Sequence, residues 1–175
     1  VLLIGSISTS VSADALNRGR NPNSPSTKPD WAGNGIGTGG GSAISPLTDA
    51  EKNGLQDAIK EEYGAMTFYQ AVILKFGDIA PFSWIMQSEQ QHANVLIRQA
   101  EKYGVAVPSN PGLIPAPVFS DLQTACQAGV TAEIEDAALY DTLKTVTTHT
   151  DIIGVYEKLQ SASLDSHLIE FQTCD

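Results

Sequence analysis

The sequence has few basic residues and no long apolar run, and both absences exclude classes of protein. Lysine and arginine together number 10, against 20 aspartate and glutamate residues, so the formal net charge is −10 at pH 7. Nucleic acids and anionic membrane surfaces bind basic patches, so this charge argues against both as partners. No apolar run approaches the ~20 residues that a membrane-spanning helix requires, so we predict no membrane span.

The composition changes near residue 46. A chain of 175 residues suits one ordinary domain and is too short for two good cores. Residues 1–46 are apolar and Ser-rich at first and then Gly-rich, so we interpret them as an extended arm and linker before a folded domain at 47–175. Two interpretations of residues 1–13 stay open. They are a remnant of a secretory signal peptide, since Val11-Ser12-Ala13 resembles a cleavage site, or a strand that joins a neighbouring subunit.

Four segments of the folded domain carry apolar residues at alternating steps of three and four, which is typical of amphipathic helices. The stripes run over Leu55–Ile73, Ile85–Tyr103, Leu122–Leu143 and Ile152–Cys174. The first helix opens with the capping box Thr48-Asp-Ala-Glu51, which satisfies free backbone N–H groups. No convincing strand follows residue 46, so we predict an all-α fold.

The connections predict how the four helices are arranged. Short links near Gly77 and near residues 147–150 make the first two helices, and the last two, antiparallel neighbours. Between the pairs lies the proline-rich segment 105–118, which in an extended conformation spans ~40 Å, about the length of a bundle. One long crossover between helices two and three is the arrangement of a ferritin-like four-helix bundle, which we expect here.

Ionisable residues stand where the apolar stripes should continue. They are Glu62, Glu89, His92, Glu133 and His167. A buried carboxylate is costly unless it is paired, neutralised or bound to a metal. Glu89 and His92 are three residues apart and project from one helix face. Carboxylate oxygen combined with imidazole nitrogen suits iron or manganese, with zinc as a further candidate. The pattern therefore predicts a metal site at mid-length.

The first and third helices repeat one spacing. Glu62 precedes Tyr69 by seven residues, and Glu133 precedes Tyr140 by the same interval. This repeat is expected of a bundle with pseudo-two-fold symmetry around two metals. Each tyrosine could be redox-active or bond a ligand, although a tyrosine on such a stripe is more often a core residue with a satisfied hydroxyl.

There are only two cysteines, and their positions are informative. Cys126 lies seven residues before Glu133, and Cys174 lies seven residues after His167. In antiparallel helices both cysteines then lie ~10.5 Å from the site level, towards the same end. We favour a disulfide over two separate buried thiols. Since a disulfide persists only in an oxidising compartment, we expect a secreted, extracellular or periplasmic protein.

These segments together resemble a known family, the ferritin-like proteins of the domain-of-unknown-function class DUF2202, which often carry a Gly-rich exported leader. The resemblance covers about residues 33–171. The matching stretches are Pro46-Leu-Thr-Asp-Ala-Glu-Lys-Asn-Gly-Leu55, Lys60-Glu-Glu62, Ser88-Glu-Gln-Gln-His92, Glu133-Ile-Glu-Asp136, Val155-Tyr-Glu157, His167-Leu168 and Phe171.

The resemblance implies a ferritin-like fold and a di-metal site, but no shared activity. By position it assigns as ligands Glu62, Glu89, His92, Glu133 and His167, with Asp136 as a further candidate. The commonest di-iron design has Glu-x-x-His on two helices. Here Leu164 stands three residues before His167, and Glu170 could substitute for the missing carboxylate. A dinuclear centre, a single metal and an eroded site held by hydrogen bonds all stay open.

Two functions follow from this pattern. The first is an exported metal-binding protein whose two irons support O₂- or peroxide-dependent iron oxidation, with manganese or zinc as alternative metals. The second is a structural subunit of an extracellular homo-oligomer or filament, assembled through residues 1–40. In that case the metal site is a relic or stabilises the subunit.

Overall fold

The computed structural model of this chain describes residues 45–112 and 119–174. The helices are α1 (Asp49–Phe76), α2 (Phe82–Lys102), α3 (Leu122–Val146) and a fourth helical stretch that consists of α4 (Thr150–Ala162), the π-helical turn η1 (Ser163–His167) and α5 (Leu168–Gln172). No strand occurs in the described ranges, which confirms the all-α prediction. The predicted arm, signal remnant and assembly strand lie outside the described residues, as does part of the proline-rich segment. None of the described helices is long and apolar enough to cross a membrane.

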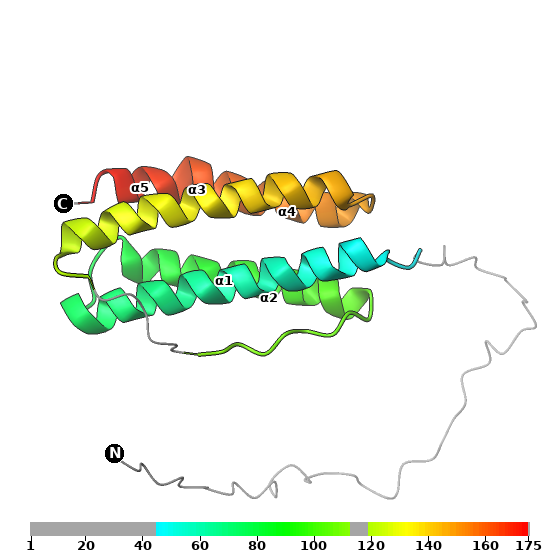
Figure 1. Cartoon of the computed structure of the whole chain (residues 1–175), viewed down its shortest axis with the longest axis horizontal. Coiled ribbons are helices and arrows are strands. Elements are labelled where there is room, and N and C mark those ends of the chain that lie inside the picture. The colour runs from blue at the N-terminus through cyan, green and yellow to red at the C-terminus, as the bar shows by residue number, and fades with distance from the viewer. Residues whose placement is uncertain (1–44, 113–118, 175) are drawn as a thin grey trace, which may run out of the picture. The chain divides into compact units, whose positions relative to one another are not determined.

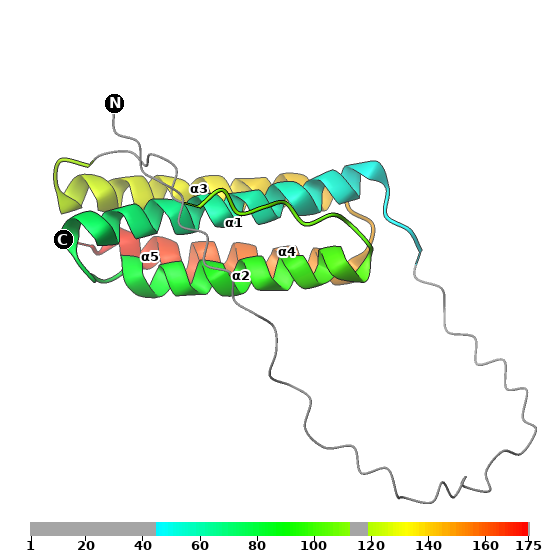
Figure 2. The same cartoon turned by 90° about the horizontal axis from the view of Figure 1, so that it is seen from below.

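The helices lie side by side along one long direction (Figures 1 and 2). α1 packs against α2 and α3, while α4 packs against α3 and α2. After α2 the chain runs back along α1, where Gln56 donates to the carbonyl oxygen of Ala106 at 2.8 Å and Thr67 donates to that of Gly112 at 3.1 Å. These two contacts place residues 106–112 along α1, as a long crossover requires.

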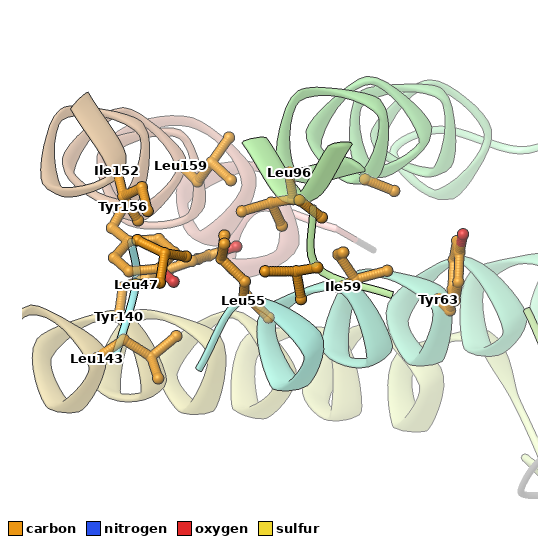
Figure 3. Packing of buried hydrophobic residues seen from close by; sticks show 14 residues of the cluster. Leu47, Leu55, Ile59, Tyr63, Leu96, Tyr140, Leu143, Ile152, Tyr156 and Leu159 are labelled. Atoms are coloured by element: carbon orange, nitrogen blue, oxygen red, sulfur yellow. The ribbon is translucent and has the colours of Figure 1, made fainter. Parts of the chain in front are cut away.

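The apolar core consists of two separate clusters. The first cluster contains Leu47, Leu55, Ala58, Ile59, Tyr63, Ala93, Leu96, Ala100, Val105, Tyr140, Leu143, Ile152, Tyr156 and Leu159. Figure 3 shows Leu55 and Ile59 of α1 beside Leu96 of α2. The second cluster contains Tyr69, Val72, Phe82, Ile85, Phe119, Ala125, Cys126 and Phe171. α1, α2, α3 and the fourth helical stretch each contribute residues to both clusters. Each of them therefore also passes through the region between the two clusters.

A disulfide and packed aromatic rings close the second cluster. Cys126 and Cys174 are bonded, with their Cα atoms 5.8 Å apart and a sequence separation of 48, which confirms the predicted pair. The ring of Phe171 lies 5.1 Å from that of Phe82 and 5.3 Å from that of Tyr69, measured between centroids. The bond therefore ties the end of α5 to α3 next to this aromatic contact.

The π-helical turn keeps the last helix facing the core. Leu159, Ser163, His167 and Phe171 are all buried at steps of four. Three such steps would rotate an ideal α-helix by about 120° away from its starting face. The backbone N–H of Leu168 instead bonds the carbonyl oxygen of Ser163, five residues earlier. This wider turn absorbs the surplus residue.

Gly129 of α3 and Phe171 of α5 offer a direct test of this packing. A Cβ atom on Gly129 would lie 2.6 Å from the ring of Phe171, so Gly129→Ala should lower the free energy of unfolding by about 1–3 kcal/mol. Gly64→Ala is the matched control, because no atom lies within 4 Å of its Cβ position. It should raise stability by about 0.5–1 kcal/mol. Urea unfolding measures both, and equal stability of the two variants would contradict the described packing.

Glu51 joins the start of α1 to the link between α3 and α4. Its carboxylate is buried and accepts from the backbone N–H of Thr48 and of Thr148, each at 2.8 Å. His149 Nδ1 donates to Glu51 Oε1 at 2.7 Å. This contact leaves His149 half-buried. Asp151, the second residue of α4, accepts hydrogen bonds from Lys102 and Tyr103 at the end of α2.

The charge of Glu51 should make this link sensitive to pH. Burial alone would raise the pKa of Glu51, but the hydrogen bonds from His149, Thr148 and Thr48 outweigh it and hold the pKa well below 4.5. The same contact raises the pKa of His149 above 6.5. The carboxylate therefore contributes stability above pH 4.5 that is lost on acidification, and the imidazolium contributes stability below pH 6.5 that is lost on alkalinisation.

Glu51→Gln should lower the free energy of unfolding by about 1–3 kcal/mol, because hydrogen bonds to a buried charge are lost. The difference from wild type should be largest between pH 4.5 and 6.5 and shrink at lower pH. Thermal unfolding across pH measures it, with the exposed Glu157→Gln as control. A difference that does not vary with pH would show that the charge of Glu51 has no role in the link.

Candidate metal centre

A polar layer separates the two core clusters. It contains all six side chains that the sequence predicts as ligands, and each is at most 8% exposed. They are Glu62 of α1, Glu89 and His92 of α2, Glu133 and Asp136 of α3, and His167 at the end of η1. The helices thus bring together residues that lie more than 100 positions apart in the sequence.

Glu89 lies between the two histidines and directs one oxygen to each. Its Oε2 is 2.6 Å from His92 Nδ1, and its Oε1 is 3.0 Å from His167 Nδ1. A second carboxylate faces each ring, because Glu62 Oε2 is 3.5 Å from His92 Nδ1 and Glu133 Oε2 is 3.3 Å from His167 Nδ1. The layer therefore contains two groups of one nitrogen and two oxygens, joined by the shared Glu89.

The Nδ1 ring nitrogens in these groups are buried, and no described residue forms a hydrogen bond with them. Within the described part of the chain, His92 Nδ1 and His167 Nδ1 have no hydrogen-bond partner, although carboxylate oxygens lie close to both. Nitrogen and oxygen atoms that surround a common ion point at the ion and not at each other. The buried Nδ1 atoms of His92 and His167, which have no partner among the described residues and lie next to carboxylate oxygens, therefore fit a divalent metal ion.

The two tyrosines of the repeated spacing orient the outer carboxylates. Tyr69 of α1 donates to Glu133 Oε1 of α3, and Tyr140 of α3 donates to Glu62 Oε1 of α1, each at 2.5 Å. Each helix of this pair thus supplies a glutamate and the donor for the other helix's glutamate. The contact leaves the second oxygen of each carboxylate free to face a histidine. Both hydroxyls bond a predicted ligand.

Ser88 is shared by the two histidines on their far side. Its Oγ lies 3.3 Å from His92 Nε2 and 3.1 Å from His167 Nε2. A serine oxygen has two lone pairs, so it can accept a hydrogen bond from both rings. A partner on Nε2 fixes the tautomer and leaves Nδ1 available for a metal, and such outer partners tune metal affinity. No pattern in the sequence indicates this role for Ser88.

A third group extends the layer towards the space between α1 and α3. Atoms of Glu61, Glu62 and Asp136 lie within 4.8 Å of one another, as do the atoms of the two groups described above. Ser163 donates to Asp136 Oδ2 at 2.5 Å. Glu61 was not predicted as a site residue, and its only signal was its place next to Glu62. Each of the three groups could hold a metal ion.

The charge balance of the layer depends on protons when no cation is bound. Burial alone would lower the pKa of His92, but the carboxylates of Glu62 and Glu89 outweigh it and raise the pKa to about 10. Likewise burial lowers the pKa of His167, while Glu133 and Glu89 raise it to about 9. Burial raises the pKa of Glu62 well above its usual range. A divalent ion that binds here must displace such protons.

The fourth helical stretch does not supply the second carboxylate of the commonest di-iron design. Leu164 and Asp165 are exposed, and Asp165 accepts a hydrogen bond from Ser161. Glu170, expected as a substitute, is also exposed, so that expectation was wrong. The reason is the π-helical turn, which directs Phe171 into the core in its place. Ser163 occupies the inner position instead.

Ser88→Ala should weaken metal binding without unfolding the protein, because it removes the shared partner of both rings. The loss should be about 10–100-fold in Mn²⁺ affinity, the usual effect of losing an outer partner. Competition with a fluorescent chelator measures the affinity, and circular dichroism checks the fold. Ser161→Ala is the control, since Ser161 is exposed on α4. Equal affinity of wild type and Ser88→Ala would exclude a positioning role for this hydroxyl.

The chain matches no known protein-family model and no curated protein. It is similar to the crystal structure of a hypothetical protein from Methanococcus jannaschii DSM 2661, with 26% sequence identity and a TM-score of 0.61. The match covers 73% of this chain and 80% of that chain. That protein is described only as hypothetical, so the likeness concerns the arrangement of the helices and carries no activity to this chain.

Proposed function

We propose that this chain is a ferritin-like four-helix bundle of the DUF2202 kind, and that its polar layer binds two divalent metal ions, iron in the first place. The observation that carries the proposal is Glu89, which directs one oxygen to each of two buried histidines. Glu62 and Glu133 complete the two groups. A shared carboxylate between two sites of similar composition is what a dinuclear centre requires.

The activity that we propose is the oxidation of ferrous iron with O₂ or peroxide. Iron bound in the layer would supply the redox chemistry. The residues of the chain bind and orient it: Tyr69 and Tyr140 hold the outer carboxylates, and Ser88 holds the histidines. The two apolar clusters on either side exclude water. Manganese or zinc would fit the same donor atoms, since all three metals accept carboxylate and imidazole ligands.

The place of action that we propose is an oxidising compartment outside the cytoplasm. The disulfide between Cys126 and Cys174 supports this, because such bonds are rare in reducing compartments. Assembly through residues 1–40 stays a prediction, because those residues lie outside the described part of the chain. Metal binding and assembly do not exclude each other.

Glu89→Gln tests the proposed function, since it removes the charge that both groups share while keeping the shape of the side chain. Ferrous iron is titrated into metal-free protein without oxygen, and O₂ uptake is then followed with an electrode. We expect wild type to bind two ions tightly and consume O₂. The variant should lose at least about 10–100-fold in affinity, and with it O₂ uptake. Glu157→Gln, exposed on α4, should behave as wild type.

The same titration at several pH values gives an independent check. Metal binding should weaken as the pH falls, because protons compete with the metal for Glu62 and His92, whose pKa values are raised. Unchanged O₂ uptake in Glu89→Gln would remove the oxidase proposal. Binding that does not depend on pH would show that the ions sit elsewhere.

A further inference from the structure

Asp136 is a buried acidic residue that the two central groups do not use. This side chain is only 6% exposed, and it belongs to neither histidine group. Its Oδ2 accepts the hydrogen bond from Ser163, whereas its Oδ1 has no hydrogen-bond partner among the residues that the structure describes. A buried carboxylate oxygen without a donor is costly, so it indicates a missing ligand.

Asp136 lines a small hollow where α1, α2 and α3 meet. Glu61, Glu89 and Glu133 line it as well, beside the small side chains of Ala65 and Ala132. Glu61 is partly exposed, while the other three acidic side chains are buried. Glu61 thus lies between solvent and the buried carboxylates of the polar layer.

Glu62 links this region to the centre. It belongs both to the group with Glu89 and His92 and to the group with Glu61 and Asp136. Glu89 in turn links the two histidine groups. The three groups are therefore linked by shared carboxylates, and Glu61 is their partly exposed member.

The net charge of the three linked groups would allow a further cation to bind. Their five carboxylates are Glu61, Glu62, Glu89, Glu133 and Asp136. No lysine or arginine of the described ranges forms an ion pair with any of them. Two divalent ions with neutral histidines would leave one of the five negative charges unbalanced. Either a proton shared by Glu61 and Asp136 or another cation must neutralise it.

We propose that Glu61, Asp136 and the shared Glu62 form a third divalent-cation site, on the side of the polar layer where Glu61 is partly exposed. Its protein ligands are all carboxylate oxygens, so it suits hard ions such as Mn²⁺ and Fe²⁺ and lacks the imidazole that favours zinc. It binds more weakly than the central sites, because it is closer to water and has no nitrogen ligand. The inference rests on the proposed function, since Glu62 serves both.

Counting bound Mn²⁺ tests the third site. Metal-free full-length protein is titrated without oxygen, and free Mn²⁺ is measured by electron paramagnetic resonance after equilibrium dialysis. Wild type should bind three ions per chain, the third more weakly. Asp136→Asn and Glu61→Gln should each bind two. The control Asp78→Asn, which changes an exposed loop carboxylate, should still bind three.

Anomalous diffraction from Mn²⁺-soaked crystals then locates the third ion, which should lie between Glu61 and Asp136. Two ions in wild type, unchanged in both variants, would overturn the third site and leave the proposed function standing, with a shared proton between Glu61 and Asp136. A third ion located elsewhere would overturn it as well. No bound ion in wild type would overturn the inference and the proposed function together.

Discussion

The burial of acidic side chains across the middle of the core is the constraint on which the rest of this structure depends. Glu62, Glu89 and Glu133 come from three different helices and are each at most 3% exposed. Such a layer repels itself unless protons or cations neutralise it. Because these groups lie together in the interior, the apolar core is divided into two clusters, one on each side of the polar layer. Stability alone does not explain this arrangement, because apolar side chains in the same layer would stabilise the packed helices more than these charged ones.

Stabilising contacts on both sides of the polar layer offset its unfavourable contribution to folding. At one end the buried Glu51 accepts hydrogen bonds from Thr48, the N-cap of α1, and from Thr148 in the link between α3 and α4. At the other end the Cys126–Cys174 bond joins residues 48 positions apart in sequence, which constrains the unfolded chain by about 4 kcal/mol in the loop-entropy account. The π-helical turn between them keeps both His167 and Phe171 directed inward. The stabilising contacts thus lie on either side of the polar layer, and the side chains of the layer are available to bind metal ions.

Much of this could be predicted from the sequence, because it depends on helical periodicity. The stripes predicted the helices, and an ionisable residue on a stripe marked five of the six candidate ligands. The sixth, Asp136, came from the family resemblance alone. The disulfide followed from two spacings of seven residues. Glu61 was missed because its neighbour Glu62 already occupied the stripe, and only three-dimensional packing shows that both face inward. Glu170 was misplaced because a π-helical turn shifts every later residue, and sequence periodicity assumes an undistorted helix. His149 pairs with Glu51, 98 positions away, which no local pattern indicates.

The central claim is that metal ions neutralise the polar layer of the folded protein. Elemental mass spectrometry of protein purified from its natural source, without chelators, measures this directly. The account predicts at least two transition-metal ions per chain, with iron the most abundant. Folded protein that contains no such metal, and takes none up from solution, would contradict it and leave a helical domain whose buried carboxylates are held by protons alone.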